Sequence, residues 1–192
     1  MGNFIFTLCD KKERPKVYKV WYDIYFREMN RNSEYANHSD ELILDDLEPN
    51  SDIILLKNEG RIIGTSRISR PSTSDLSYYH DLYQLHEFHE NNVCIVTRYM
   101  IYKEHRNRDL GYALALATVE CCHKFNIQWI VMDCSPNLYG YFEKLGFESH
   151  LGVMHHPEYG EVKIMKFNVR TKIETPLNNK NLRQKYASTF QF

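Results

Sequence analysis

The sequence has no excess of charge of either sign: 24 lysines and arginines balance 25 aspartates and glutamates among 192 residues. A strongly basic protein would be drawn to nucleic acid or to an anionic membrane, so neither partner is expected and any basic site must be local. Long apolar runs are also absent, and a membrane span needs about 18 such residues. The opening segment has no basic region before its short apolar stretch, which is not typical of a secretion signal. We therefore expect a cytoplasmic protein without a transmembrane segment.

Cysteines are few and odd in number, and they lie mostly in apolar segments, which does not suit a disulfide framework. The nine histidines include no HExxH pattern, and no paired CxxC is present. Zinc sites usually have such ligand spacings, so no metal cofactor is expected. We interpret the thiols as reduced and buried; they are Cys9, Cys94, Cys121, Cys122 and Cys134.

Strand-like and helix-like segments alternate along the chain without an internal repeat. A strand–helix–strand unit over residues 93–133 predicts a parallel strand pair joined by a crossover helix. We expect one α/β domain over residues 1–170 and a C-terminal extension over 171–192, either mobile or a short docking helix. The expected elements are a strand at 4–9, a helix at 14–30, a loop at 30–41, a hairpin at 51–69 around "NEG", a short helix within 76–91, a strand at 93–102, a helix from Gly111, a strand at 127–135, a helix at 137–147 capped by Gly146, and a closing strand at 161–169.

The stretch "KEHRNRDLGYALA" places basic residues and one glycine between the strand at 93–102 and the helix that follows. The first amides of a helix lack intrahelical acceptors and carry partial positive charge, which suits a phosphate. Arg106 and Arg108 add charged donors, and Gly111 lets the backbone approach closely. The alternative is a solvated charged loop before an ordinary helix.

The runs "YMIYKEHRNRDLGYAL" and "YFEKLGF" together resemble the GCN5-related N-acetyltransferase (GNAT) superfamily. The resemblance implies a mixed, mostly antiparallel central sheet flanked by helices, with a splayed parallel strand pair. It also implies that the strand segment Tyr99, Met100 and Ile101 pairs with a pantetheine arm, and that one backbone N–H there polarises the thioester carbonyl. The loop that would hold the carrier's pyrophosphate comprises Arg106, Asn107, Arg108, Asp109, Leu110, Gly111, Tyr112 and Ala113.

This loop fits the family pattern, Arg/Gln-x-x-Gly-x-Gly/Ala, in two registers. The preferred one starts at Arg106, puts Asp109 where glycine is usual and keeps Gly111; the other uses Arg108, Gly111 and Ala113. A carboxylate at Asp109 should weaken phosphate binding unless Arg106 or Arg108 pairs with it.

A second departure concerns the proton for the leaving thiolate. The resemblance places a tyrosine where this chain has Phe142, and Tyr141 can replace it only if the helix is rotated. Otherwise Tyr141 is a packing or surface residue.

The N-terminal half resembles a narrower group, the acyl-homoserine lactone synthases and related N-acyl amino acid synthases. The matching features are an aromatic and basic helix "VYKVWYDIYFREM", then Gly64, Arg67 and Pro71 at a strand end, and the triplet "TRY" at Thr97–Tyr99. Lactone synthases usually carry a glutamate where this chain has Ile95, which argues against lactone synthesis itself.

This narrower resemblance implies a long-chain acyl thioester as donor, on coenzyme A or acyl carrier protein, and an amino acid or similar amine as acceptor. Arg67 and Arg98 are then candidates to bind the acceptor carboxylate; the alternative is an internal ion pair with Asp45, Asp46 or Asp52. Asp133, at the end of a strand, is a candidate general base, although it is equally placed to cap the next helix.

We therefore predict an N-acyltransferase with Arg98, Asp133 and Tyr141 as catalytic candidates. The leading hypothesis is an N-acyl amino acid synthase that uses a long-chain acyl-CoA or acyl carrier protein. The alternatives are an acetyl-CoA-dependent N-acetyltransferase of a small molecule or protein, and a non-catalytic protein that binds acyl-CoA or a partner. A long-chain enzyme should have a deep apolar tunnel beside the strand at 93–102, and an acetyltransferase a shallow one.

Overall fold

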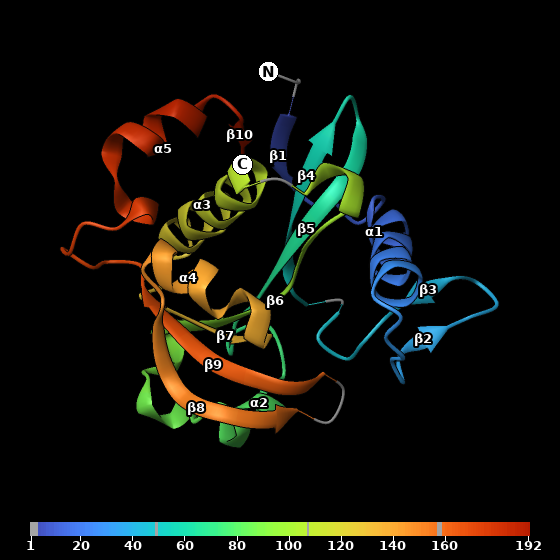
Figure 1. Cartoon of the computed structure of the whole chain (residues 1–192), viewed down its shortest axis with the longest axis horizontal. Coiled ribbons are helices and arrows are strands. Elements are labelled where there is room, and N and C mark those ends of the chain that lie inside the picture. The colour runs from blue at the N-terminus through green and yellow to red at the C-terminus, as the bar shows by residue number, and fades with distance from the viewer. Residues whose placement is uncertain (1–3, 49, 107, 157–158) are drawn as a thin grey trace.

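The computed structural model describes residues 4–48, 50–106, 108–156 and 159–192. An eight-stranded sheet in the order β10-β1-β4-β5-β6-β7-β9-β8 forms its centre (Figure 1). Only the pairs β1–β10 and β6–β7 are parallel among these strands, so the predicted mixed, mostly antiparallel α/β sheet is confirmed. The strands are β1 (Phe4–Leu8), β4 (Asp52–Asn58), β5 (Arg61–Ser69), β6 (Val93–Ile101), β7 (Trp129–Cys134), β8 (Glu148–His156), β9 (Gly160–Asn168) and β10 (Phe190–Gln191).

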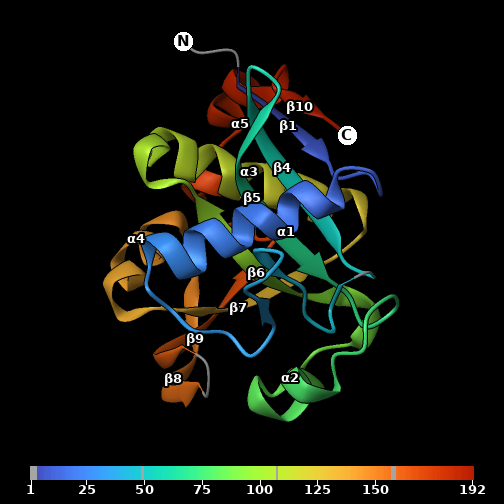
Figure 2. The ribbon, with the colours of Figure 1, turned by 90° about the vertical axis from the view of Figure 1, so that its right-hand side faces the viewer.

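Helices cover both faces of the sheet. Figure 2 shows α1 (Arg14–Tyr22) across one face, with α3 (Arg108–Lys124) behind the sheet. Strand β4 has apolar side chains on both faces, and each face needs a helix to cover it. Ile53 and Leu55 pack with α1, while Ile54 and Leu56 pack in the cluster of α3. A strand buried on both faces has a continuous apolar run, as "IILL" has here.

The remaining elements are short. Helix α1 continues as a π-helical segment, Asp23–Glu28, and a small hairpin pairs β2 (Ala36–Asn37) with β3 (Leu42–Ile43). The other helices are α2 (Ser77–Leu82), α4 (Tyr139–Leu145) and α5 (Lys180–Ala187). Single 3-10 turns occupy Leu85–Glu87, Glu90–Asn92, Lys103–His105, Pro136–Leu138 and Pro176–Asn178.

The turns follow the chemistry that the sequence predicted. Glu59 and Gly60 both have positive φ, 50° and 80°, as the tight turn of the β4–β5 hairpin requires. Gly146 has φ 101° and ends α4 in the left-handed conformation.

Three local predictions need correction. Helix α3 begins at Arg108, three residues before Gly111. The polar stretch at 30–41 was expected as a loop, but it contains β2, which pairs with β3 in a small hairpin. The helix expected within 76–91 is only the six residues of α2, because Gln84 turns to φ 50° and the chain continues in 3-10 turns.

A bulge in β6 shapes the region beside the loop. Between the pairs Arg67–Thr97 and Thr65–Met100, β6 has one residue more than β5, and Arg98 takes φ 51°. The hydroxyl of Thr65 donates to the Arg98 carbonyl at 2.9 Å and accepts from the indole N–H of Trp21 at 3.0 Å. These buried bonds hold the left-handed conformation of Arg98, which a β-strand arginine would otherwise avoid.

The C-terminal extension packs on the sheet and on α3. Its last strand, β10, pairs in parallel with β1, and Figure 1 shows α5 beside α3. The hydroxyl of Tyr112 on α3 donates to the carbonyl of Pro176 at 2.7 Å. The division of the chain at residue 170 stays a prediction. Within the part of the chain that the structure describes, no helix is long and apolar enough to cross a membrane.

Candidate active site

Strands β6 and β7 separate in the middle of the sheet. Their parallel ladder comprises the pairs Val93–Trp129, Cys94–Ile130 and Ile95–Val131, although β6 runs on to Ile101. Beyond this point lies a cavity of about 110 Å³, called the cleft below. The apolar side chains on its wall include Val96, Met100, Met132, Leu138 and Phe142. Three ionisable side chains also line it, namely Arg31, Arg98 and Asp133.

The backbone of β6 turns polar groups toward this cleft. The N–H of Tyr102 donates to the Ile63 carbonyl of β5 at 2.9 Å. Because consecutive residues of a strand alternate in direction, the N–H and C=O groups of Ile101 and Tyr99 point away from β5, to the side where the β7 ladder has ended. The Ile101 carbonyl accepts from Nε of Arg106 at 2.7 Å.

Arg98, Asp45 and Arg67 form a buried cluster at the cleft. Nη2 of Arg98 lies 2.8 Å from Oδ2 of Asp45, and Nη1 of Arg67 bonds to the other carboxylate oxygen. Burial would favour the neutral carboxyl, but the two guanidinium groups outweigh it, so the pKa of Asp45 is lowered. The alternative of an internal ion pair is thus confirmed for both arginines, with Asp45 as the partner.

The two arginines differ in what they face. Arg67 completes its contacts inside the protein, since Nε donates to Thr97 Oγ1 at 2.9 Å and its guanidinium lies over Trp21. Arg98 lines the cleft, with its guanidinium 4.5 Å from the ring centroid of Tyr25. Its Nε and Nη1 are buried and have no hydrogen-bond partner among the residues that the structure describes.

Asp133 also lines the cleft, at the end of β7. Its Oδ1 accepts from the hydroxyl of Tyr83 at 3.0 Å, while the 3-10 turn after Ser135 has no side-chain cap. Burial raises the pKa of Asp133, more than the positive potential of His156 and the Tyr83 hydrogen bond lower it. A buried carboxyl of raised pKa is a stronger base than an ordinary aspartate once it is ionised.

A larger cavity of about 590 Å³ adjoins the cleft through Tyr159, which lines both. The Tyr159 ring stacks on His156, with centroids 4.3 Å apart. Carboxylates on the wall of this second cavity are Glu34, Asp45, Asp46 and Asp75.

The tyrosines at the far side of the cleft are linked through their hydroxyls. Tyr99 lines the cleft and donates to the carbonyl of Gly111 at the start of α3. The Tyr141 hydroxyl lies 3.4 Å from that of Tyr99. Phe142 faces the cleft, whereas Tyr141 lines a third cavity of about 470 Å³ on the other side of the pair.

The predicted phosphate loop is only partly visible as a site. Arg106 is ion-paired with Glu28, and Asp109 is exposed. Leu110 and Ala113 are buried in the core, and their place in the carrier loop stays a prediction. Asn107 lies outside the described residues, as does the side chain of Arg108.

A steric contact explains why position 111, in the first turn of α3, is a glycine. A Cβ at this position would lie 2.9 Å from the hydroxyl of Tyr141.

Sequence reasoning missed several residues of the cleft. Tyr25 and Met29 come from the end of the N-terminal helical segment, and Tyr159 from the region between β8 and β9. Arg31 lies with its guanidinium 5.6 Å from the Tyr159 ring centroid and donates to Ser135 at 3.4 Å. The helical spacing of Tyr25 was the only available signal, since the other residues reach the cleft through the fold.

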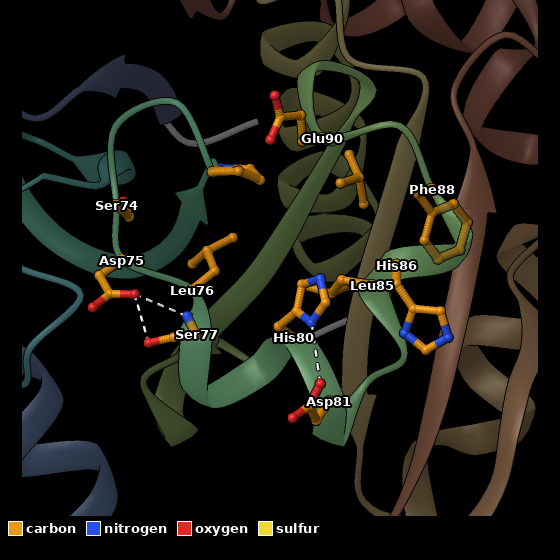
Figure 3. Close-up of a pocket in the computed structure, with 12 residues that line it drawn as sticks. Ser74, Asp75, Leu76, Ser77, His80, Asp81, Leu85, His86, Phe88 and Glu90 are labelled. Carbon is orange, nitrogen blue, oxygen red and sulfur yellow. Dashed lines mark hydrogen bonds and ion pairs between the residues drawn. The ribbon is translucent and has the colours of Figure 1, made fainter.

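The histidines of α2 and of the 3-10 turn that follows it lie outside the cleft. Figure 3 shows His80 and His86 around a cavity of about 720 Å³, where His80 contacts Asp81. None of the residues lining this cavity lines the cleft. Over the described ranges, no group of three or more histidine, cysteine or acidic side chains is placed to hold a metal ion.

Solved structures of acyltransferases share this fold. BjaI, a CoA-dependent acyl-homoserine lactone synthase solved with SAM and isopentyl-CoA, superposes with a TM-score of 0.76 at 14% identity, over 98% of this chain and 92% of BjaI. The acyl-homoserine lactone synthase LasI gives 0.73 at 14% identity, over 93% of this chain and 96% of LasI. FeeM, an N-acyl amino acid synthase from uncultured soil microbes, gives 0.67 at 11% identity, over 86% and 90% of the two chains.

Curated protein sequences give no match to this chain. The family model described as FeeM, N-acyl amino acid synthase, matches residues 16–168. That span includes both sides of the cleft, from α1 to the end of β9. The GNAT-like fold and the N-acyltransferase activity predicted from the sequence are confirmed. The chain therefore belongs to the FeeM family of N-acyl amino acid synthases and moves an acyl group from a thioester to an amine.

Proposed function

We propose that the acceptor is an amino acid and that Arg98 binds its carboxylate in the cleft. The observation that carries this proposal is a charge count: two buried guanidinium groups, Arg98 and Arg67, share the single carboxylate of Asp45. While Asp133, which lines the same cleft as Arg98, keeps its proton, the cluster has one uncompensated positive charge, and such a cluster is costly unless an anion joins it. Nε and Nη1 of Arg98 supply the donors that such an anion needs, because neither has a partner among the described residues.

Arg67 acts in this proposal through Asp45. Its side chain is 1% exposed and does not line the cleft, so we assign it to holding the carboxylate that orients Arg98. Arg67 is then a positioning residue, and the expectation that it contacts the acceptor directly is replaced by an indirect role.

Asp133 is our candidate for the general base. The acceptor arrives as an ammonium ion, and its nitrogen can attack only after losing a proton. Asp133 takes that proton, directly or through a water, and Tyr83 holds the carboxylate in place. The new C–N bond forms as the C–S bond breaks, and a second proton leaves the nitrogen for the thiolate, so the products are an amide, a thiol and one released proton.

The remaining roles fall to the other side of the cleft. The N–H groups of Tyr99 and Ile101 face the unpaired side of β6, where one of them can stabilise the developing oxyanion. Tyr141 is the candidate to carry that second proton, since it donates its hydroxyl proton to the thiolate and is reprotonated by the proton that leaves the nitrogen. It reaches the cleft through Tyr99, whose hydroxyl lies 3.4 Å away.

The acyl group lies along the apolar wall of the cleft in this proposal. The volume of about 110 Å³ suits a short acyl group, which favours the acetyl-CoA alternative. Three of the six methionines line the same wall, however, and methionine side chains adapt their shape readily. Met29 and Leu138 at the rim are also 40% and 41% exposed, as an acyl chain lying across them would explain. We therefore keep the long-chain assignment.

The decisive experiment compares an amino acid with its decarboxylated amine as acceptors for Arg98→Lys and the unmodified protein. Lysine keeps the charge but loses the planar fork. KM for the amino acid should rise about tenfold or more in Arg98→Lys, whereas KM for the decarboxylated amine should not change. Arg61→Lys, an exposed arginine on the β4–β5 hairpin, is the matched control.

Equal use of both acceptors by the unmodified protein would remove the carboxylate from the proposal. A series of acyl thioesters from acetyl to palmitoyl tests the acyl chain in the same assay. A preference for acetyl would replace the long-chain assignment by the acetyltransferase alternative.

A further inference from the structure

The second cavity, of about 590 Å³, has an acidic wall. Glu34, Asp46 and Asp75 line it, and each is exposed and makes no ion pair with a residue that the structure describes. The fourth carboxylate, Asp45, is already held by two arginines. Among the described residues of the wall, only His156 has a basic side chain. Negative charge therefore exceeds positive charge in this cavity, and the resulting field attracts a cation.

Two of the carboxylates belong to the segment around the β2–β3 hairpin. Glu34 precedes β2 and Asp46 follows β3, and Tyr35 lies on the wall with them. Burial raises the pKa of Tyr35, and the negative charges of Glu34 and Asp46 raise it further. Both carboxylates thus act on the same part of the cavity.

Asp75 adds a carboxylate from the segment before α2. The amide and the hydroxyl of Ser77 both donate to its Oδ1, at 2.9 and 2.6 Å (Figure 3). These hydrogen bonds lower the pKa of Asp75 and fix the position of its carboxylate. Asp75 is therefore ionised at neutral pH.

Aromatic rings make up much of the remaining wall. The Tyr78 and Tyr79 rings meet edge to face with centroids 5.0 Å apart, and the Tyr159 ring stacks on His156. The face of an aromatic ring attracts a cation. A long basic side chain can lay its methylene stem on such rings while its charged end meets carboxylates. Lysine, ornithine and arginine side chains fit this combination.

An independent observation links this cavity to the acceptor. Asp45 lines the cavity and accepts a hydrogen bond from Arg98, which lines the cleft. Nε and Nη1 of Arg98 are buried without a partner among the described residues, which points to a ligand anion at that end. The anion site and the acidic cavity are thus one ion pair apart, and Tyr159 lines both the cleft and the cavity. A molecule with a carboxylate at one end and a cation at the other matches this arrangement.

We propose that the acceptor is an amino acid with a cationic side chain, and that Glu34 and Asp46 bind this cation in the second cavity. The proposal rests on the proposed function, in which Arg98 holds the carboxylate of the acceptor. With that carboxylate on Arg98 and the α-amine at Asp133, the side chain is the part of the acceptor that enters the cavity. A side-chain ammonium group among carboxylates keeps its proton and cannot attack the thioester, so the α-nitrogen is the one acylated.

Transfer from one acyl-coenzyme A to lysine, norleucine and cadaverine tests the proposal. Norleucine keeps the aliphatic stem of lysine without the ammonium group, and cadaverine is lysine without the carboxylate. The unmodified protein should use lysine about tenfold better than norleucine, as measured by kcat/KM, and mass spectrometry should place the acyl group on the α-nitrogen. Calorimetric binding of lysine and norleucine without a donor should give the same order.

The double variant Glu34→Gln/Asp46→Asn should raise KM for lysine about fivefold or more and leave KM for norleucine unchanged. Asp81→Asn/Glu90→Gln is the matched control. It removes two carboxylates from the cavity around His80, and neither of them lines the second cavity. The control should use all three acceptors as the unmodified protein does.

Norleucine used as well as lysine, an equal loss in the two double variants, or acylation of the side-chain nitrogen would overturn the cation site. Failure of the proposed function gives a different result. Cadaverine would then be used as well as lysine, and the use of both would still depend on Glu34 and Asp46.

Discussion

Arg98 and Asp45 form a buried ion pair, with Nη2 of Arg98 2.8 Å from Oδ2 of the carboxylate, and Arg67 occupies the other oxygen. One carboxylate thus holds two guanidinium groups at the cleft. The proposed acceptor site therefore depends on a residue that lies between α1 and β4, far from β6 in the sequence.

Asp45→Asn should destabilise the protein strongly. The substitution leaves two buried guanidinium groups without a counter-charge, and removal of one partner from a buried ion pair typically costs about 3–5 kcal/mol. Urea unfolding at pH 7 measures this change. Asp46→Asn removes the neighbouring exposed carboxylate and should change the free energy of unfolding by less than about 0.5 kcal/mol. Similar losses in the two variants would contradict the shared role of Asp45.

The lowered pKa of Asp45 predicts how the difference in free energy of unfolding between the unmodified protein and Asp45→Asn changes with pH. A carboxyl with a lowered folded pKa contributes stability above its unfolded pKa of about 3.9, and this contribution is lost as pH falls through the folded pKa. The stability gap between the unmodified protein and Asp45→Asn should therefore narrow on acidification below about pH 4.

For Asp133 the pH dependence of stability should have the opposite sign. Its pKa is raised by burial, so the folded protein favours the neutral carboxyl, which Asn imitates. Between about pH 4 and the folded pKa, the unmodified protein should lose about 1.4 kcal/mol per pH unit relative to Asp133→Asn. Above the folded pKa the difference should be constant. Unfolding of both proteins by urea at several pH values measures it.

If the unmodified protein instead gained stability relative to Asp133→Asn as pH rises, Asp133 would be stabilised as the carboxylate. The same variant tests the proposed catalytic role, since loss of a general base lowers kcat by about 100-fold or more. An unchanged kcat would assign Asp133 to structure alone.

The sequence predicted β1, β4 to β7, β9 and the parallel crossover because their signals are local, whereas β8, β10 and the β2–β3 hairpin were not among the expected strands. The apolar runs of β4 to β7 and the glycines at positions 60 and 146 encode them within a few residues. The left-handed Arg98 has no such signal. It depends on the Thr65 hydroxyl from β5 and on Trp21 from α1, which only the folded chain brings together.

The residues of the candidate site also fall into those with a local sequence signal and those without one. The "TRY" triplet singled out Arg98, and position at the end of a strand singled out Asp133 and the loop before α3. Tyr159 and Lys185 reach their cavities from the region between β8 and β9 and from the extension, and no local pattern predicts that approach. Asp45 was named among three possible partners, and only the folded chain brings it between the two arginines.

Gly111 and Tyr141 should be coupled in stability. An alanine Cβ at position 111 would lie 2.9 Å from the Tyr141 hydroxyl, and the next atom of that side chain would be 3.6 Å away. Within a helix, Gly→Ala is otherwise worth about 1 kcal/mol in favour of the folded state. Gly111→Ala should therefore gain nothing or lose stability in the unmodified background, because the hydroxyl must move away from Tyr99.

In the Tyr141→Phe background the clash is absent, and Gly111→Ala should stabilise the protein. The double-mutant cycle should give a coupling of about 1 kcal/mol, within the usual range for residues in contact. Gly140→Ala provides the control, because a Cβ there meets no atom within 4 Å. Its effect on unfolding should be the same with Tyr141 and with Phe at that position. A cycle that closes to zero for Gly111 would mean that Tyr141 does not lie against α3, and the partition between the cleft and the third cavity would be lost with it.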